Sequence, residues 1–153
     1  MTTSQQDPNS EITERFSLIV DDPASFAVRD GERPWTADEL TDVCGELLVA
    51  SERLAKDIEQ ADRALSDMLR NSGDGAGDDQ ADSGASALER EHELSILNNS
   101  RDLQAQNSHA LERIRVGTYG NCEQCGEAIG KARLRAFPRA TLCVTCKQRQ
   151  ERR

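Results

Sequence analysis

The chain has 153 residues, of which 36 % are hydrophobic and only 3 % aromatic, and its formal net charge is −9. So little aromatic area argues against a β-sandwich or barrel with a large core and favours long amphipathic helices. No apolar run approaches the ~20 residues that cross a bilayer, and the first eleven residues lack the basic start and apolar stretch of a signal peptide. We therefore expect a cytoplasmic protein without membrane association.

The charge is divided unevenly along the chain. Residues 112–153 carry ten Lys/Arg and four Asp/Glu, whereas residues 1–111 carry nine Lys/Arg and twenty-four Asp/Glu. An acidic body argues against coating nucleic acid, because phosphate binding is mainly electrostatic. It fits a protein partner with a basic surface, approached with electrostatic steering.

Residues 1–34 show no long periodicity and are interrupted by three prolines. Chain termini are commonly loose, so we predict a flexible N-terminal tail over residues 1–34. The alternative is that its two apolar clusters, residues 16–20 and 26–28, dock on another part of the protein.

A first long helix is predicted from about residue 37 to residue 70. Thr36 and Glu39 form a capping box at its start, and Trp35 and Leu40 flank this box as a hydrophobic staple. The core-facing positions then follow at spacings of four and three residues, which is the coiled-coil repeat. They are Leu40, Cys44, Leu47, Ser51, Leu54, Ile58, Ala61, Leu65 and Met68.

An acidic, glycine-rich stretch at about residues 71–85 favours neither helix nor strand and predicts a loop. A second capping box, Ser86 and Glu89, predicts the start of a second helix that ends near Val116. Two long helices joined by one loop close as an antiparallel hairpin, here over residues 35–116. The predicted seam of the second helix is less regular and consists of Ile96, Leu103, Ala110 and Ile114, with polar Ser100 and Asn107 between.

Four cysteines follow the hairpin with the spacing C-x2-C-x17-C-x2-C, at Cys122, Cys125, Cys143 and Cys146. Two C-x2-C pairs can complete the tetrahedron of thiolates around one Zn²⁺, and such a site has no open position for catalysis. Disulfides or a redox switch are the alternatives, but cytoplasmic cysteines are normally reduced. We predict one structural Zn²⁺ and a zinc-finger module over residues 117–153. The expected fold is mainly α: an antiparallel helical hairpin (coiled coil) with a C-terminal four-cysteine zinc-finger module and a short C-terminal helix.

The stretch GTYGNCEQCGEAIGKARLRAFPRATLCVTC, at residues 117–146, resembles the zinc-finger signature of the DksA/TraR family of bacterial regulators that bind RNA polymerase. The resemblance covers about residues 79–149. Besides the four cysteines it rests on Gly120, Gly126, Ile129, Arg133, Leu134, Pro138 and Leu142.

This resemblance implies a function and a set of tip residues. Members of the family carry a D-x-x-D-x-A motif at the hairpin tip, which Asp79 and Asp82 match, while Gly84 replaces the alanine. The hairpin would enter the secondary channel of RNA polymerase and place these carboxylates near the catalytic magnesium, while the zinc module docks near the channel rim. The protein would then be a monomeric transcription regulator, not an enzyme, with no catalytic residues.

The resemblance also concerns guanosine tetraphosphate, which family members bind partly through basic residues. Lys147 occupies one such place and is a possible contact for the alarmone or the polymerase. Phe137 and Gln106 are uncharged where basic residues are expected, so we predict no strong alarmone binding. The alternative function is direct nucleic-acid binding through the basic C-terminal end. No aromatic residues for base stacking are interleaved there, which argues against it.

Overall fold

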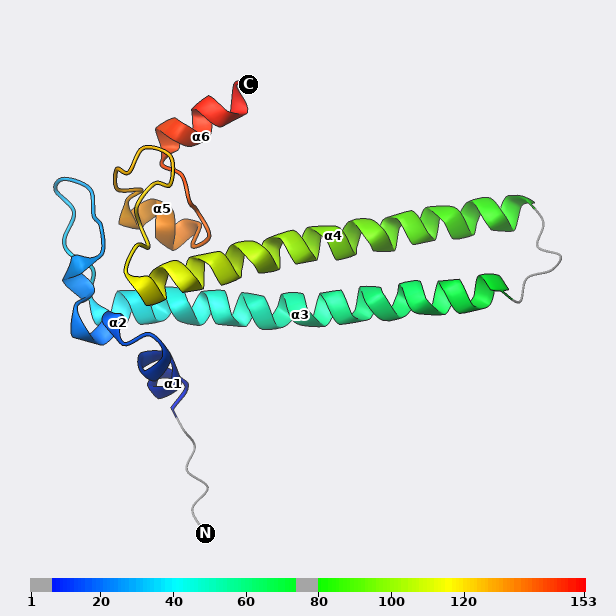
Figure 1. Ribbon diagram of the computed structural model, residues 1–153, viewed down its shortest axis with the longest axis horizontal. Helices are drawn as coiled ribbons and strands as arrows, with labels where there is room; N and C mark the ends of the chain where they lie inside the picture. The colour runs from blue at the N-terminus through cyan, green and yellow to red at the C-terminus, as the bar shows by residue number, and fades with distance from the viewer. Residues whose placement is uncertain (1–6, 74–79) are drawn as a thin grey trace, which may run out of the picture. The chain divides into compact units, whose positions relative to one another are not determined.

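The computed structural model describes residues 7–73 and 80–153, and all its regular elements are helices (Figure 1). Two compact units divide the chain: a base unit of residues 1–49 with 107–153, and an arm unit of residues 50–106. The helices are α1 (Pro8–Arg15), α2 (Leu18–Asp21), the 3₁₀ turn η1 (Pro23–Ser25), α3 (Ala37–Gly73), α4 (Gln80–Val116), α5 (Lys131–Ala136) and α6 (Val144–Glu151).

Helix α3 begins at the predicted capping box. The backbone N–H of Glu39 donates to Thr36 Oγ1 at 3.2 Å, and the backbone N–H of Thr36 donates to Glu39 Oε1 at 3.1 Å. This exchange satisfies two amides that the first helical turn leaves without partners. Every predicted seam position of α3 is buried or half-buried. Cys44 in this seam is fully buried, and burial raises the pKa of its thiol to about 12, so it stays protonated and packs as a small apolar group.

Helix α4 departs from its prediction at two places. It begins at Gln80, so Ser86 lies inside the helix and the second capping box is wrong. Its inward residue is Leu97, at 4 % exposure, and not Ile96, which is 36 % exposed. The helix ends at Val116, as predicted, and the next residue is Gly117, whose φ of 88° only glycine adopts readily. No helix within residues 7–73 and 80–153 combines the length and the apolar character that crossing a membrane requires.

The arm unit is an antiparallel pair formed by α3 from residue 50 onward and α4 up to residue 106 (Figure 1). Ala61, Leu97 and Ser100 are its most buried side chains. Arg101 of α4 lies 3.6 Å from Asp62 of α3 and so bridges the two helices on the surface. The hairpin prediction is confirmed, but its loop is shorter than residues 71–85 because helix continues on both sides; residues 74–79 lie outside the described part.

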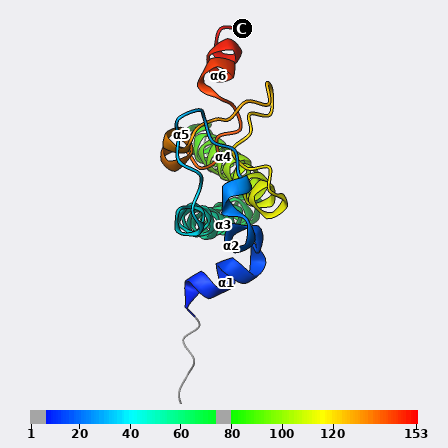
Figure 2. The same cartoon turned by 90° about the vertical axis from the view of Figure 1, so that its left-hand side faces the viewer.

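The prediction of a flexible tail over residues 1–34 is wrong for residues 7–34. Helices α1 and α2 lie on the side of α3 that faces away from α5 and α6 (Figure 2). The two apolar clusters supply the reason, because they bury enough hydrocarbon against the rest of the base unit to offset the entropy of ordering the segment. The side chains buried in this way, each at most 7 % exposed, are Ile12, Phe16, Ile19 and Phe26.

Candidate metal centre and hairpin tip

The first cysteine pair lies in a tight turn directly after α4. The backbone N–H of Cys122 donates to the carbonyl of Glu127 at 2.8 Å, and that of Gly126 donates to the carbonyl of Cys122 at 2.9 Å. Gly126 has a φ of 78°, a backbone conformation that glycine adopts readily and other residues rarely do. The turn directs both sulfurs of the pair to one side, as a zinc knuckle requires.

The second pair lies at the start of α6. Cys143 is the N-cap of this helix, and its Sγ accepts a hydrogen bond from the backbone N–H of Cys146 at 3.5 Å. Amides at a helix N-terminus stabilise negative charge, so this position suits a thiolate. One residue of the pair thus serves as helix cap and candidate metal ligand at once.

The four sulfurs lie within 4.8 Å of one another, and this is the only group of potential metal ligands found in the described part of the chain. Tetrahedral zinc with Zn–S bonds of about 2.3 Å separates its sulfurs by about 3.8 Å. The Sγ atoms of Cys125 and Cys143 are 3.8 Å apart, which fits this geometry and is far too long for a disulfide of about 2.05 Å. The residues therefore form a site for one structural Zn²⁺.

The pKa values of two of the thiols, Cys122 and Cys146, are shifted in opposite directions. Burial opposes ionisation of Cys122, but backbone N–H groups that reach its sulfur, foremost that of Cys125, outweigh it and lower the pKa of the thiol to about 6. Burial raises the pKa of the Cys146 thiol to about 12. Zinc binds thiolates, so a divalent cation among these sulfurs offsets the cost of ionising the buried one.

Arg113, near the end of α4, attaches the first knuckle to this helix. Its guanidinium is buried and donates to the carbonyls of Thr118, at 2.9 Å, and Asn121, at 2.5 Å. Its Nε lies 3.6 Å from Glu123, whose carboxylate also contacts His109. Charge-assisted hydrogen bonds of this kind are about twice as strong as neutral ones. The sequence offered no signal for Arg113, because its partners are carbonyls that only the folded turn brings together.

A second attachment runs from α5 to the start of α3. Lys131 donates from Nζ to Glu39 Oε1 at 2.7 Å and from its backbone N–H to Glu32 Oε2 at 2.9 Å. Its ammonium also lies 5.3 Å from the centre of the Trp35 ring, within cation–π range. The hydrogen bond from Lys131 is the main reason why the pKa of Glu39 is lowered, so this carboxylate is charged at neutral pH.

Residues 27–30 and the two zinc knuckles together line a groove of about 610 Å³. They pass so close to the module that a Cβ on Gly120 would lie 3.2 Å from the Ala27 carbonyl oxygen, and Gly120 has a φ of 97°. Glycine at this family-signature position therefore has a steric and a conformational reason. The N-terminal segment is part of the setting of the metal site.

Two of the three predicted tip residues lie at the start of α4. Asp82 and Gly84 belong to this helix, whereas Asp79 and the side chain of Asp82 lie outside the described residues. A Cβ at Gly84 would meet nothing within 4 Å, so an alanine would fit there. Lys147 lies on the exposed surface of α6, with Nζ 4.0 Å from Glu151. The structure thus brings the four cysteines together in the base unit and places Asp82 and Gly84 in the arm unit.

Comparison with known proteins agrees with this architecture. A family model described as the prokaryotic dksA/traR C4-type zinc finger matches residues 117–152. The structure of transcription factor DksA2 from Pseudomonas aeruginosa superposes with a TM-score of 0.62 and 32 % identity, covering 75 % of this chain and 84 % of that one. The chain belongs to the DksA/TraR family.

Curated DksA/TraR relatives match over shorter stretches. The RNA polymerase-binding transcription factor DksA of Caulobacter vibrioides is 44 % identical over 75 residues, which are 49 % of this chain and 53 % of the relative. The protein of the same name from Escherichia coli K12 is 38 % identical over 63 residues, or 40 % and 42 % of the two chains. This DksA/TraR chain therefore spans about half the length of the curated relatives it matches.

Proposed function

We propose that the protein is a transcription regulator that binds RNA polymerase in the cytoplasm. The tip of the arm unit would enter the secondary channel and modulate promoter complexes, while the zinc module has a structural role. The names of the Caulobacter and Escherichia relatives, both RNA polymerase-binding transcription factors, support the choice of partner. The absence of an open coordination position in a four-cysteine site supports a structural role for the metal.

The observation that carries this proposal is the acidic antiparallel helix pair of the arm unit. Residues 50–106 hold thirteen Asp/Glu and six Lys/Arg, a net charge of −7. Two packed helices, each about 10 Å in diameter, form a rod narrow enough for a pore. Negative charge on such a rod favours entry into a channel with basic walls and speeds its encounter with the polymerase.

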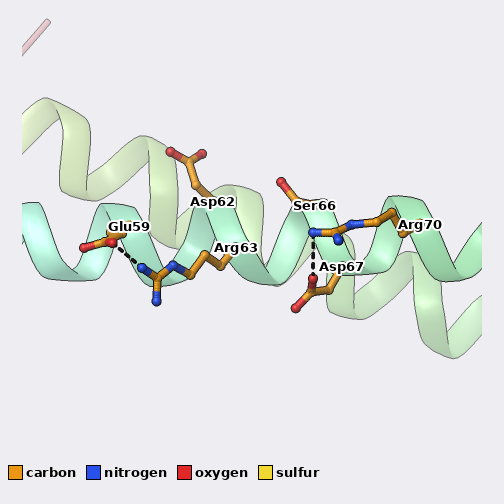
Figure 3. A pocket seen from close by; sticks show the side chains of 6 residues that line it. All are labelled: Glu59, Asp62, Arg63, Ser66, Asp67 and Arg70. Atoms are coloured by element: carbon orange, nitrogen blue, oxygen red, sulfur yellow. Dashed lines mark hydrogen bonds and ion pairs between the residues drawn. The ribbon is translucent and has the colours of Figure 1, made fainter.

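One flank of α3 is close to neutral, so it is a weaker candidate for the polymerase contact than the tip. Glu59 pairs with Arg63 at 2.5 Å and Asp67 with Arg70 at 3.3 Å, beside a shallow groove of about 430 Å³ (Figure 3). These side chains are 59 to 78 % exposed, so their pairs contribute little stability and leave little net charge for a partner. We assign the active contact instead to Asp79 and Asp82, with Gly84 beside them.

The test separates binding from regulation. Asp82→Asn removes one tip charge and keeps the side-chain volume, so it should abolish the effect of the protein on transcription in vitro while binding to core RNA polymerase stays within about threefold. Glu59→Gln is the matched control, since it removes one charge from the α3 flank and should leave both readouts unchanged. A crosslinker at position 82 should reach the walls of the secondary channel. If Asp82→Asn regulates like the parent protein, the tip assignment fails.

We also propose that guanosine tetraphosphate is not a strong ligand of this chain. Lys147 is exposed and available to an anion or to the polymerase, but Phe137 and Gln106 bring no positive charge. The alternative function, direct nucleic-acid binding by the basic C-terminal end, predicts a salt-sensitive electrophoretic shift of DNA without polymerase. Such a shift at physiological salt would favour that alternative.

A further inference from the structure

Residues 27–34, which we call the strap, contact the zinc-finger module from the N-terminal part of the chain. The strap contains no helix or strand. It is held at both ends, because the residues on either side of it, Phe26 and Trp35, are each at most 2 % exposed. The indole N–H of Trp35 also donates to the carbonyl of Ala27 at 3.1 Å. The strap is therefore a loop with fixed ends whose middle part is free to take part in other contacts.

The carboxylate of Glu32 joins the strap to α5. Its Oε1 accepts from the backbone N–H of Arg29 at 2.7 Å, and its Oε2 accepts from the backbone N–H of Lys131 at 2.9 Å. Lys131 is the first residue of α5, and the N-cap residue, Gly130, has no side chain that could satisfy an amide of the first turn. Glu32 thus supplies, from 99 positions away in sequence, the cap that α5 lacks.

Other contacts hold the strap against the start of α5. The ammonium of Lys131 donates to the carbonyl of Arg33 at 3.3 Å. A Cβ on Gly130 would lie 2.9 Å from Cδ of Arg29, so the strap passes directly against the backbone there. The first turn of α5 is therefore fixed by the strap on one side, with Glu32 as the residue that contacts both.

The position of α5 matters for the metal because this helix connects the two cysteine pairs in the chain. Cys125 precedes it and Cys143 follows it. Cys125 is exposed and Cys143 half-buried, and both line the groove whose opposite lining is residues 27–30 of the strap. An ion held by four thiolates leaves when one pair moves away from the other. A contact that fixes α5 opposes this movement.

We propose that Glu32 is a positioning residue of the zinc site: by joining the strap to α5 it keeps the two cysteine pairs together and slows the loss of Zn²⁺. Glu32 acts through α5 and does not ligate the ion itself. The inference concerns retention of the metal, so it goes beyond the proposed function and does not depend on RNA polymerase as the partner.

The first experiment measures how fast the zinc-loaded full chain loses its metal to an excess of a chromogenic chelator. Glu32→Gln keeps the shape of the side chain, but its amide offers an oxygen to only one of the two N–H donors and leaves its NH₂ group facing the other. We expect zinc loss about tenfold faster than in the parent protein, as the loss of a hydrogen bond to a charged group implies. Glu14→Gln is the matched control, since Glu14 is exposed on α1 outside the strap, and should lose zinc at the parent rate.

Ile19→Ala distinguishes this role from a general contribution to stability. Ile19 is fully buried on α2, outside the strap, so its truncation should lower the urea midpoint more than Glu32→Gln does. It should nevertheless speed zinc loss less than Glu32→Gln. If zinc loss in the variants follows the order of their urea midpoints, or if Glu32→Gln loses zinc at the parent rate, Glu32 only stabilises the base unit and the inference is wrong.

A second measurement uses the unmodified protein and does not depend on the folding of any variant. Coupling between two sites is reciprocal, so bound zinc should in turn stabilise the contacts of Glu32. Removing zinc should therefore speed hydrogen exchange of the Arg29 amide, which donates to Glu32, about tenfold. The Phe16 amide, which donates to the carbonyl of Ile12 in α1, should change much less. Equal exchange of the Arg29 amide with and without zinc would overturn the inference.

Discussion

Substituting Ile19 tests whether the N-terminal segment belongs to the core of the base unit. Ile19 in α2 is fully buried, whereas its neighbour Val20 is 53 % exposed. Ile19→Ala removes three carbons, each worth about 0.8 kcal/mol of burial. The cavity left behind adds to this loss, so we expect about 3 kcal/mol of destabilisation. Val20→Ala shortens an exposed side chain and should change stability by less than about 0.5 kcal/mol.

Urea denaturation followed by the fluorescence of Trp35 measures this difference directly. Trp35 is the only tryptophan and is 2 % exposed within the same core cluster as Ile19, so its emission reports the base unit. With a slope of about 1.5 kcal/mol per M, Ile19→Ala should lower the urea midpoint by roughly 2 M. Equal midpoints for Ile19→Ala and Val20→Ala would refute the docking of this segment and restore the flexible tail.

Two further predictions concern the zinc module. Cys146→Ser should reduce bound zinc from one equivalent to none and unfold the module. Far-UV circular dichroism should keep most of its helical signal, because α5 and α6 hold six and eight residues against 37 each in α3 and α4; complete loss of helix would contradict this. Tyr119→Phe should cost about 1 kcal/mol through the lost hydrogen bond to Pro138. Burial raises the pKa of Tyr119 above its ordinary value of 10.0, so its stabilising effect is present below pH 10 and is lost as the pH rises further. Alkaline unfolding of the parent should therefore begin earlier than that of Tyr119→Phe, and coincident alkaline transitions would refute this reasoning.

The sequence predicted the elements whose pattern is local. The seam of α3 repeats at spacings of four and three residues, so its inward face could be read directly. Cysteine spacing likewise predicted the cluster of four sulfurs that the structure shows, because two C-x2-C pairs are typical of a four-cysteine zinc site. The seam of α4 was harder to read, since Ser100 and Asn107 occupy buried positions as polar residues. The interval of seven residues before Leu103 predicts Ile96 as the inward residue, whereas the buried side chain is that of the adjacent Leu97.

What the sequence did not predict depends on contacts between distant segments. Helices α1 and α2 have eight and four residues, too few for periodicity to appear, and they are stabilised by burial against the base unit rather than by propensity. The available signal was the pair of apolar clusters at residues 16–20 and 26–28. Arg113 gave no signal, because a buried arginine satisfied by backbone carbonyls looks in sequence like any charged residue on a helix.

Contacts of Glu39 connect the zinc module to the first turn of α3, so the two depend on each other. One carboxylate oxygen of this residue completes the capping box of α3 and also accepts the hydrogen bond from Lys131 of α5. The second oxygen lies 3.6 Å from Arg135 of the same short helix. Since α5 has only six residues, it cannot persist alone and must be held by the zinc knuckles on either side of it in the chain. Loss of the metal therefore removes the cationic partners of Glu39 and leaves the first turn of α3 with its local cap alone.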